Sequence, residues 1–133
     1  MKATILNKGV ASGPVLLLTE PLSFWGAYDP RTGRIVDTHH AQSGAYLGGH
    51  ILLLKETRGS GGTPGGIAEA IRRGTAPLGI VLASSDINLA IGAAVAARLY
   101  SRQCPVMSVT LVEFETLETK SHITIAEDGQ ITV

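Results

Sequence analysis

A strand, a glycine-rich turn and a helix follow one another in the middle of the chain, and this order constrains the fold most. The apolar run Ile51–Leu54 predicts a buried strand, and the segment after it reads Arg58-Gly59-Ser60-Gly61-Gly62-Thr63-Pro64. We expect a helix next, with Thr63 suited to the N-cap and Pro64 to the first helical position. Gly74 suits the left-handed residue that follows a helix.

The same alternation continues toward the C-terminus. Leu78–Ala83 and Pro105–Val109 are short apolar runs that predict two more strands. Between them we expect a helix capped by Ser84 or Ser85 and running to about Tyr100. Its apolar stripe recurs every four residues and is formed by Ile87, Ile91, Val95 and Leu99, widened by Ala90, Ala94 and Ala97. Such short β–α–β connections predict parallel strands with right-handed crossovers.

Both ends of the chain are β-rich by pattern. Residues 1–57 contain the candidate strands Ala3–Leu6, Gly13–Leu18, Arg34–Val36 and Gly49–Leu54, separated by glycine and proline. At the other end, two alternating segments flank Asp128-Gly129, which is a strong hairpin signal. The sequence therefore predicts a single α/β domain over residues 1–133, with a β-rich N-terminal half beside a parallel βαβαβ core.

Composition excludes several classes of protein. The 11 basic and 11 acidic residues cancel to zero formal net charge, which argues against a nucleic-acid partner. The single cysteine, Cys104, excludes an internal disulfide, suits a reducing compartment and is expected to be a buried thiol rather than a nucleophile. Because we find no signal-peptide pattern and no membrane-spanning run, we expect a cytoplasmic protein without a membrane partner.

The glycine-rich turn has the chemistry of an anion site. A helix N-terminus offers free backbone N–H groups at the positive end of the helix dipole, and Arg58 adds a full positive charge beside the Ser60 hydroxyl. A dinucleotide fingerprint does not fit, because Pro64 replaces its third glycine. A P-loop does not fit either, because Ile67 follows Gly66 where lysine is required. A turn without any ligand is the alternative.

Aromatic and histidine residues mark two further segments. Phe24, Trp25 and Tyr28 gather in an expected loop, which is either a small core beneath that loop or a surface for a partner. The side chains of His39 and His40 point to opposite faces if the segment is extended, so the pair does not chelate one ion. The sequence has no recognisable metal-ligand spacing, and we expect no metal site in this chain.

Together these motifs resemble the small subunit of the aconitase X dehydratases. The resemblance extends from about Gly9 to Met107. No single motif is specific to the family, but the order and spacing of the whole set are. They are Leu22-Ser23-Phe24-Trp25-Gly26, then Asp29-Pro30 with Thr32-Gly33, His39-His40 through Gly44 and Gly48, Arg58-Gly59-Ser60, and Arg73-Gly74-Thr75-Ala76-Pro77. The fold that this resemblance implies is the swivelling β/β/α domain related to the mobile domain of aconitase.

The resemblance also implies half of an active site. In aconitase-like enzymes the swivel domain closes over a large domain whose cysteines hold an iron–sulfur cluster, and a swivel-domain serine removes a proton beside a carboxylate. That serine corresponds to Ser60. One cysteine cannot hold a cluster that needs three or four, so the cluster is expected on a separate large subunit. Relatives commonly have further serines after the matching one, whereas here Gly61, Gly62 and Thr63 follow.

Two sets of site residues follow from this resemblance, with Ser60 as the expected general base. Arg58 either binds the substrate carboxylate or stabilises the Ser60 alkoxide, and the sequence leaves both roles open. The expected substrate-binding set is Arg58, Gly59, Gly61, Gly62 and Thr63. The set expected to contact the large subunit or the substrate is Ser23, Phe24, Trp25, Gly26, His39 and His40.

The implied substrate is a small hydroxylated carboxylate, and two compounds of this kind are candidates. Bacterial relatives dehydrate cis-3-hydroxy-L-proline, and archaeal relatives dehydrate mevalonate 5-phosphate. We expect cis-3-hydroxy-L-proline, because the turn offers a site for one carboxylate and contains no lysine for a phosphate. Arg31 and Arg34 flank another turn and are able to reach a phosphate, so mevalonate 5-phosphate remains an alternative substrate. A swivel or docking module without its own active site is the remaining alternative.

Overall fold

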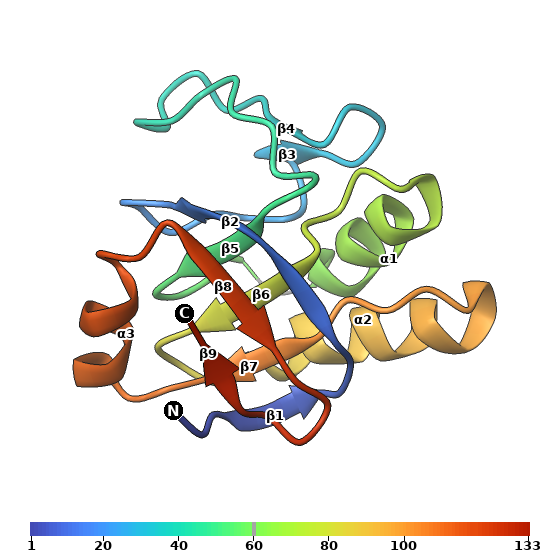
Figure 1. Ribbon diagram of the computed structural model, residues 1–133. Coiled ribbons are helices and arrows are strands. Elements are labelled where there is room, and N and C mark those ends of the chain that lie inside the picture. Colours follow the sequence, from blue (N-terminus) through green and yellow to red (C-terminus); the bar gives the residue numbers. More distant parts are fainter. Residues whose placement is uncertain (60) are drawn as a thin grey trace.

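The computed structural model describes residues 1–59 and 61–133 and shows one curled, mostly parallel sheet with helices packed on it (Figure 1). The sheet order is β1-β7-β6-β5-β2-β8-β9, and β3 and β4 form a separate hairpin. The strands are β1 (Thr4–Asn7), β2 (Ala11–Leu17), β3 (Tyr28–Asp29), β4 (Arg34–Ile35), β5 (Ile51–Leu54), β6 (Gly79–Leu82), β7 (Val106–Ser108), β8 (His122–Ile125) and β9 (Ile131–Thr132). The helices are α1 (Thr63–Arg73), α2 (Ile87–Tyr100) and α3 (Leu111–Leu117).

The centre of the sheet is parallel, as the βαβαβ pattern predicts. Strands β2, β5, β6 and β7 are parallel neighbours, with Leu52 paired to Leu16 on one side and to Ile80 on the other. All four residues of β5 are buried, because Leu52 and Leu54 face the helices α1 and α2 while Ile51 and Leu53 face the inside of the curl. A strand covered on both faces explains the unbroken apolar run.

The β-rich N-terminal half predicted from the sequence contributes strands on both sides of β6. They extend the same sheet on both sides, since β1 pairs antiparallel with β7 and β2 pairs parallel with β5. The curl brings the chain ends together: the Ala3 N–H donates to the Gly129 carbonyl at 2.9 Å, and the Ile131 N–H donates to the Met1 carbonyl at 2.7 Å. This contact is a single antiparallel bridge between Lys2 and Gln130, so it joins the two edges of the sheet only at the start of the chain.

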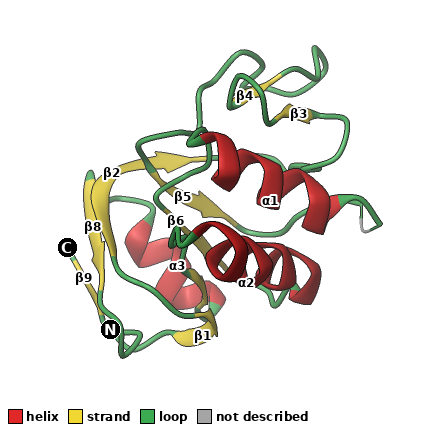
Figure 2. Cartoon of the chain, turned by 90° about the vertical axis from the view of Figure 1, so that its right-hand side faces the viewer, coloured by secondary structure: helices red, strands yellow, loops and turns green. Residues whose placement is uncertain are grey.

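Helices α1 and α2 lie side by side on one face of the sheet, and α3 lies on the other (Figure 2). Gly92 makes the close contact between α1 and α2 possible, because a Cβ at this position would lie 2.5 Å from the Pro64 carbonyl oxygen. Helix α3 was not expected from the sequence. It begins with a capping box in which the Thr110 hydroxyl accepts from the Glu113 N–H and the Glu113 carboxylate accepts from the Thr110 N–H.

The face of α2 that packs inward is not the expected one. The buried positions are Leu89, Ala90, Gly92, Ala93 and Ala96, whereas the stripe Ile87, Ile91, Val95 and Leu99 is exposed. The reason is steric: α2 approaches α1 closely at Gly92, and four of the five buried positions are alanine or glycine, while the aliphatic stripe remains outside. The N-cap is Asp86, not Ser84 or Ser85, and its carboxylate accepts from the Asn88 and Leu89 N–H groups at 2.9 and 3.1 Å.

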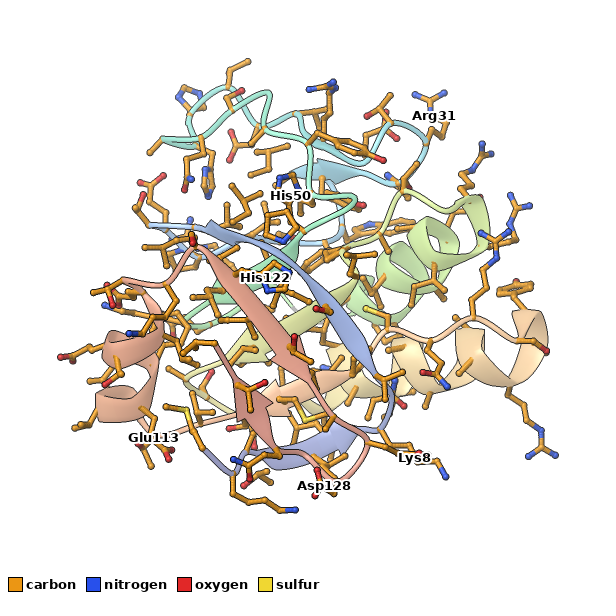
Figure 3. The ribbon with its side chains drawn as sticks, viewed as in Figure 1. Lys8, Arg31, His50, Glu113, His122 and Asp128 are labelled. Carbon is orange, nitrogen blue, oxygen red and sulfur yellow. The ribbon has the colours of Figure 1, made fainter. Side chains whose placement is uncertain are left out.

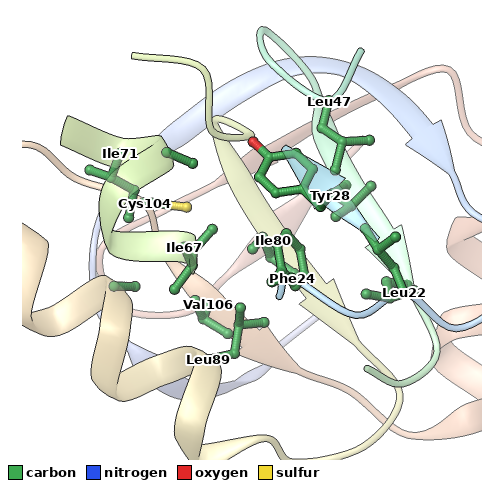
Figure 4. Close-up of a cluster of buried hydrophobic side chains, with 14 of the residues drawn as sticks. Leu22, Phe24, Tyr28, Leu47, Ile67, Ile71, Ile80, Leu89, Cys104 and Val106 are labelled. Atoms are coloured by element: carbon green, nitrogen blue, oxygen red, sulfur yellow. The ribbon is translucent and has the colours of Figure 1, made fainter. Parts of the chain in front are cut away.

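The segment after β2 forms part of the main core (Figure 4). Phe24 is fully buried and meets Tyr28 edge to face, with ring centroids 5.2 Å apart. The expectation that Phe24 contacts a partner or substrate is therefore wrong for its side chain. Of the two readings of the aromatic segment, a core beneath the loop is correct for Phe24 and Tyr28, while Trp25 is exposed.

Candidate functional site

Three connecting segments meet at the carboxyl ends of the parallel strands, where open α/β sheets bind their ligands. They follow β2, β5 and β6, and backbone hydrogen bonds join them. The Arg58 N–H donates to the Leu22 carbonyl at 2.9 Å, and the Ala83 N–H donates to the Lys55 carbonyl at 3.1 Å. The segment that contains the glycine-rich turn therefore lies between the other two.

Side chains strengthen this arrangement on the β6 side. The Thr57 hydroxyl donates a hydrogen bond to Asp86 Oδ2, while Asp86 Oδ1 caps α2. The Ser84 hydroxyl donates to the Lys55 carbonyl at 3.1 Å. Sequence reasoning missed Thr57 and Asp86. The signal was present, because Asp86 directly precedes the first apolar residue of the helix and is a strong N-cap type.

The expected catalytic base, Ser60, lies outside the described residues. The described residues on both sides define where the turn begins and ends. Gly59 has φ +79°, a left-handed conformation that favours glycine, and α1 begins at Thr63 after the N-cap Gly62. The helix ends as predicted, at a left-handed Gly74 whose N–H bonds to the carbonyls of Ala70 and Ile71.

The β2 segment packs directly on the glycine-rich turn. A Cβ on Gly62 would lie 2.1 Å from Trp25 Cγ, and a Cβ on Gly59 would lie 3.2 Å from Ser23 Oγ. Ser23 in turn fixes the local bend, since its hydroxyl donates to the Trp25 carbonyl at 2.8 Å. The structure thus brings Ser23 and Trp25 against the turn.

The glycines of the turn have one packed side and one open side. Gly62 is packed beneath Trp25, and a Cβ on Gly66 would lie 2.0 Å from the Phe24 carbonyl oxygen. By contrast, among the described residues and apart from chain neighbours and the α1 backbone, no atom lies within 4 Å of a Cβ placed on Gly61 or Gly65. The N-terminal end of α1 is therefore accessible from one side. No acidic residue occupies its first turn, so its positive end is not neutralised there.

Thr63 does not cap α1, contrary to expectation, because it is the first residue of the helix and makes no side-chain cap bond. Pro64 accordingly takes the second helical position. The Thr63 side chain is buried, with 1% of the residue exposed, and Oγ1 has no hydrogen-bond partner among the described residues. Buried hydroxyl groups normally have a partner, so this one stands out as available to a group that enters the turn.

Arg58 and Gly26 remain exposed, whereas the histidines belong to a different loop. The Arg58 guanidinium makes no hydrogen bond or ion pair with a described residue, and is thus available to an anion. His39 is exposed, and His40 is buried with its Nδ1 accepting from the Gln42 N–H at 3.0 Å and lying 3.8 Å from Glu20 Oε1. Because Glu20 follows β2, these contacts place His40 near the end of that strand and not at the glycine-rich turn.

The chemistry of the described side chains does not suit a metal centre. Among residues 1–59 and 61–133, no group of three or more His, Cys, Asp or Glu side chains is placed to hold a metal ion. Cys104 is buried as predicted, and burial raises the pKa of its thiol to about 12, so it is neither a ready ligand nor a nucleophile. No helix in the described part of the chain is long and apolar enough to cross a membrane.

A pocket of about 220 Å³ lies at the same sheet edge, next to the site. Its lining includes Lys55 together with the carboxylates of Glu20, Glu56 and Glu118. The lining thus carries three carboxylates and one ammonium group, a balance that favours a cation over a phosphate. The lining of this pocket therefore differs in charge from the glycine-rich turn, where Arg58 is the charged residue.

Comparison with known proteins gives two kinds of relative. A protein named cis-3-hydroxy-L-proline dehydratase from Pseudomonas aeruginosa is 42% identical over 101 residues, which are 76% of this chain but only 17% of that relative's length. A protein named phosphomevalonate dehydratase small subunit from Methanothermobacter thermautotrophicus is 37% identical over 92 residues, covering 69% of this chain and 70% of the relative. The chain thus corresponds to a small part of the first and to most of the second.

The fold and the family agree with these relatives. The crystal structure of holo-form aconitase X from Thermococcus kodakaraensis superposes with a TM-score of 0.81 at 24% identity, covering 99% of this chain and 97% of the matched one, which establishes the fold. The aconitase X swivel domain family matches residues 1–133, the whole chain. The resemblance drawn from the motifs is therefore confirmed, and this chain belongs to the aconitase X swivel domain family.

Proposed function

We propose that this chain is the small subunit of an aconitase X hydro-lyase, active only with a separate large subunit. The proposed reaction is the dehydration of a hydroxylated carboxylate, with Ser60 as the general base. The observation that carries the proposal is the glycine-rich turn at the start of α1, which has an open side, an available arginine and a buried hydroxyl. Family membership of the whole chain supports the reaction class.

The turn can supply what a serine base requires. A serine hydroxyl is a weak acid, so its alkoxide needs strong electrostatic stabilisation in a site closed to water. The amide groups at the start of α1 and the positive end of the helix dipole provide it from one side. The Thr63 hydroxyl is a further donor for the alkoxide or for a substrate oxygen. Arg58 either pairs with the substrate carboxylate or adds to the positive potential.

An iron–sulfur cluster is the cofactor proposed for the complete enzyme, and this chain does not fit as its holder. Such a cluster needs three or four cysteine thiolates, whereas the sequence has one cysteine, and that thiol is buried and un-ionised at neutral pH. The cluster is accordingly assigned to the large subunit. The role of this chain is to bind and orient the substrate and to remove the proton.

We propose cis-3-hydroxy-L-proline as the substrate, because this half-site offers one anion position. Two other cations considered for a phosphate, Arg31 and Arg34, are engaged elsewhere. Arg31 is paired with Asp29 at 3.3 Å and points away from the sheet (Figure 3), and Arg34 donates to the Gly44 carbonyl and lies over the Tyr46 ring. Lys55 lines the neighbouring pocket, to which Glu20, Glu56 and Glu118 also contribute. Mevalonate 5-phosphate is the second candidate, since relatives of both names are similar to this chain.

The test is to reconstitute the chain with the aconitase X large subunit of the same organism and to measure turnover of both compounds. Ser60→Ala should assemble normally and lose about a hundredfold to ten-thousandfold in kcat, because a general base contributes that much. Ser85→Ala, which alters an exposed serine at the same sheet edge, is the matched control and should retain activity. Near-normal turnover by Ser60→Ala would instead support a docking role.

A further inference from the structure

One face of α2 carries an exposed aliphatic ridge. Its residues lie four apart, so they align on one side of the helix, and the exposed fractions are 72% for Ile87, 48% for Ile91, 45% for Val95 and 65% for Leu99. From Ile87 to Leu99 the ridge is about 18 Å long at 1.5 Å per residue. A continuous exposed apolar surface of this kind on a soluble domain marks an interaction site.

The ridge is not typical of the outer surface of this layer. The neighbouring helix α1 presents an ionic cluster, in which Glu69 pairs with Arg72 and with Arg73 at 2.5 and 3.0 Å. In α2 the only charged residue is Arg98. A shallow hollow of about 350 Å³ between Ala94, Val95, Arg98 and Leu99 could receive an apolar side chain. Of the two helices on this face, only α2 is suited to an apolar partner.

We propose that this ridge, Ile87, Ile91, Val95 and Leu99, is a binding surface for the large dehydratase subunit. The inference rests on the proposed function, because a substrate held between the glycine-rich turn and a cluster on the large subunit requires the carboxyl edge of the sheet to face that subunit. The ridge begins at this edge: Ile87 follows Asp86, whose carboxylate is bonded to Thr57 just before Arg58. A subunit that covers the glycine-rich turn therefore also contacts the first turn of α2, which lies beside it.

The size of the relatives favours the large subunit over a second copy as the occupant. This chain spans only 17% of the Pseudomonas aeruginosa dehydratase, so in that protein the matched region is accompanied by a much longer polypeptide. The ridge is apolar along its whole length and so suits the poorly charged centre of a permanent interface. A partner lying along α2 would continue the contact made at the turn.

The experiment measures binding of the purified chain to the large subunit by titration calorimetry. The test variant is Val95→Glu with Leu99→Glu, two exposed positions whose change leaves the core intact. We expect its Kd to rise about a hundredfold, because each buried glutamate costs tenfold or more. The matched control is Val112→Glu, since Val112 is 75% exposed and lies on α3, on the opposite face of the sheet (Figure 2). Its Kd should change by less than about threefold.

Three results would overturn the inference. The first is unchanged binding of the large subunit by the double variant, and the second is equal weakening of that binding by Val112→Glu. The third is that the wild-type chain sediments as a dimer and the double variant as a monomer, while the double variant still binds the large subunit. The last result would assign the ridge to a second copy. Failure of the proposed function looks different: the complex would form through the ridge yet dehydrate neither compound.

Discussion

Thr57 donates its hydroxyl hydrogen bond to Asp86, the residue that caps α2. The bond joins the segment that leads from β5 to Arg58 with the first turn of the helix that follows β6. Two neighbouring β–α connections are thus locked together at the carboxyl edge of the sheet. The contact lies directly before Arg58, where the glycine-rich turn begins, although neither residue belongs to the turn.

Asp86→Ala should destabilise the chain by about 1–2 kcal/mol, the usual cost of losing an N-cap side chain. Thr57→Val removes only the bond between the segments and leaves the cap, so its effect should be smaller, about 0.5–1.5 kcal/mol. Urea unfolding followed by circular dichroism measures both. If Thr57→Val costs as much as Asp86→Ala, the cap is not the main role of the carboxylate.

Two adjacent glycines of α1 should respond in opposite ways to alanine. Gly66→Ala places a methyl group against the Phe24 carbonyl, a backbone atom that cannot move aside, and should destabilise the chain by about 1–3 kcal/mol. Gly65→Ala meets no described atom within 4 Å outside its chain neighbours and the α1 backbone, and should stabilise the helix by about 0.5–1 kcal/mol. The same unfolding measurement compares them. Equal free energies of unfolding for the two variants would contradict the packing described between α1 and Phe24.

Alkaline pH should destabilise the folded chain. Burial raises the pKa of Cys104 from 9.0 to about 12, and burial also raises the pKa of Tyr28 from 10.0 to about 12, against the lowering effect of its hydrogen bond to Thr75. Both groups ionise more easily in the unfolded chain. Their contribution to stability is therefore complete below pH 9 and declines as pH rises from 9 toward 12.

The two groups can be separated by substitution. Cys104→Ala should remove the loss of stability that begins near pH 9, and Tyr28→Phe should remove the part that begins near pH 10. Urea unfolding midpoints at pH 8, 9, 10 and 11 provide the comparison. A Cys104→Ala variant whose midpoint falls with pH as steeply as the wild type would exclude the thiol as the cause.

Local sequence patterns predicted the parts of the fold in which one signal dominates. The apolar runs of β5, β6 and β7, the Gly74 terminus of α1 and the Asp128-Gly129 hairpin are all present. The orientation of α2 was wrong because two of its faces are apolar, one aliphatic and one of alanine and glycine. Periodicity identifies the helix but not which of these faces packs, and the close approach of α1 decides it.

The candidate site was predictable in part for the same reason. Arg58, Gly59, Gly61, Gly62 and Thr63 are consecutive around the turn, so their proximity follows from the sequence, while their role in substrate binding stays a prediction. Contacts between distant segments carry no local signal in the sequence. Examples are the packing of Trp25 on Gly62, the burial of Phe24 in the core, and the position of His40 beside Glu20 instead of the turn. Only the folded arrangement of the long loops decides these.

Thr63 offers the sharpest separation of stability from function. Its hydroxyl is buried without a partner among the described residues, so Thr63→Val, which keeps the shape and removes the polar atom, should raise the free energy of unfolding of the isolated chain by about 1 kcal/mol. If the hydroxyl serves the turn as proposed, the same variant should lose about tenfold in kcat when assembled with the large subunit.

Thr63→Ser is the matched control, because it keeps the hydroxyl and loses only a methyl group. It should retain most of the turnover while being less stable than the wild type by about 1 kcal/mol. If Thr63→Val is the more stable variant and Thr63→Ser is the more active one, this position sacrifices stability for the reaction. A Thr63→Val complex that is both more stable and fully active would remove the hydroxyl from the site and leave the backbone amides of α1 and Arg58 as its donors.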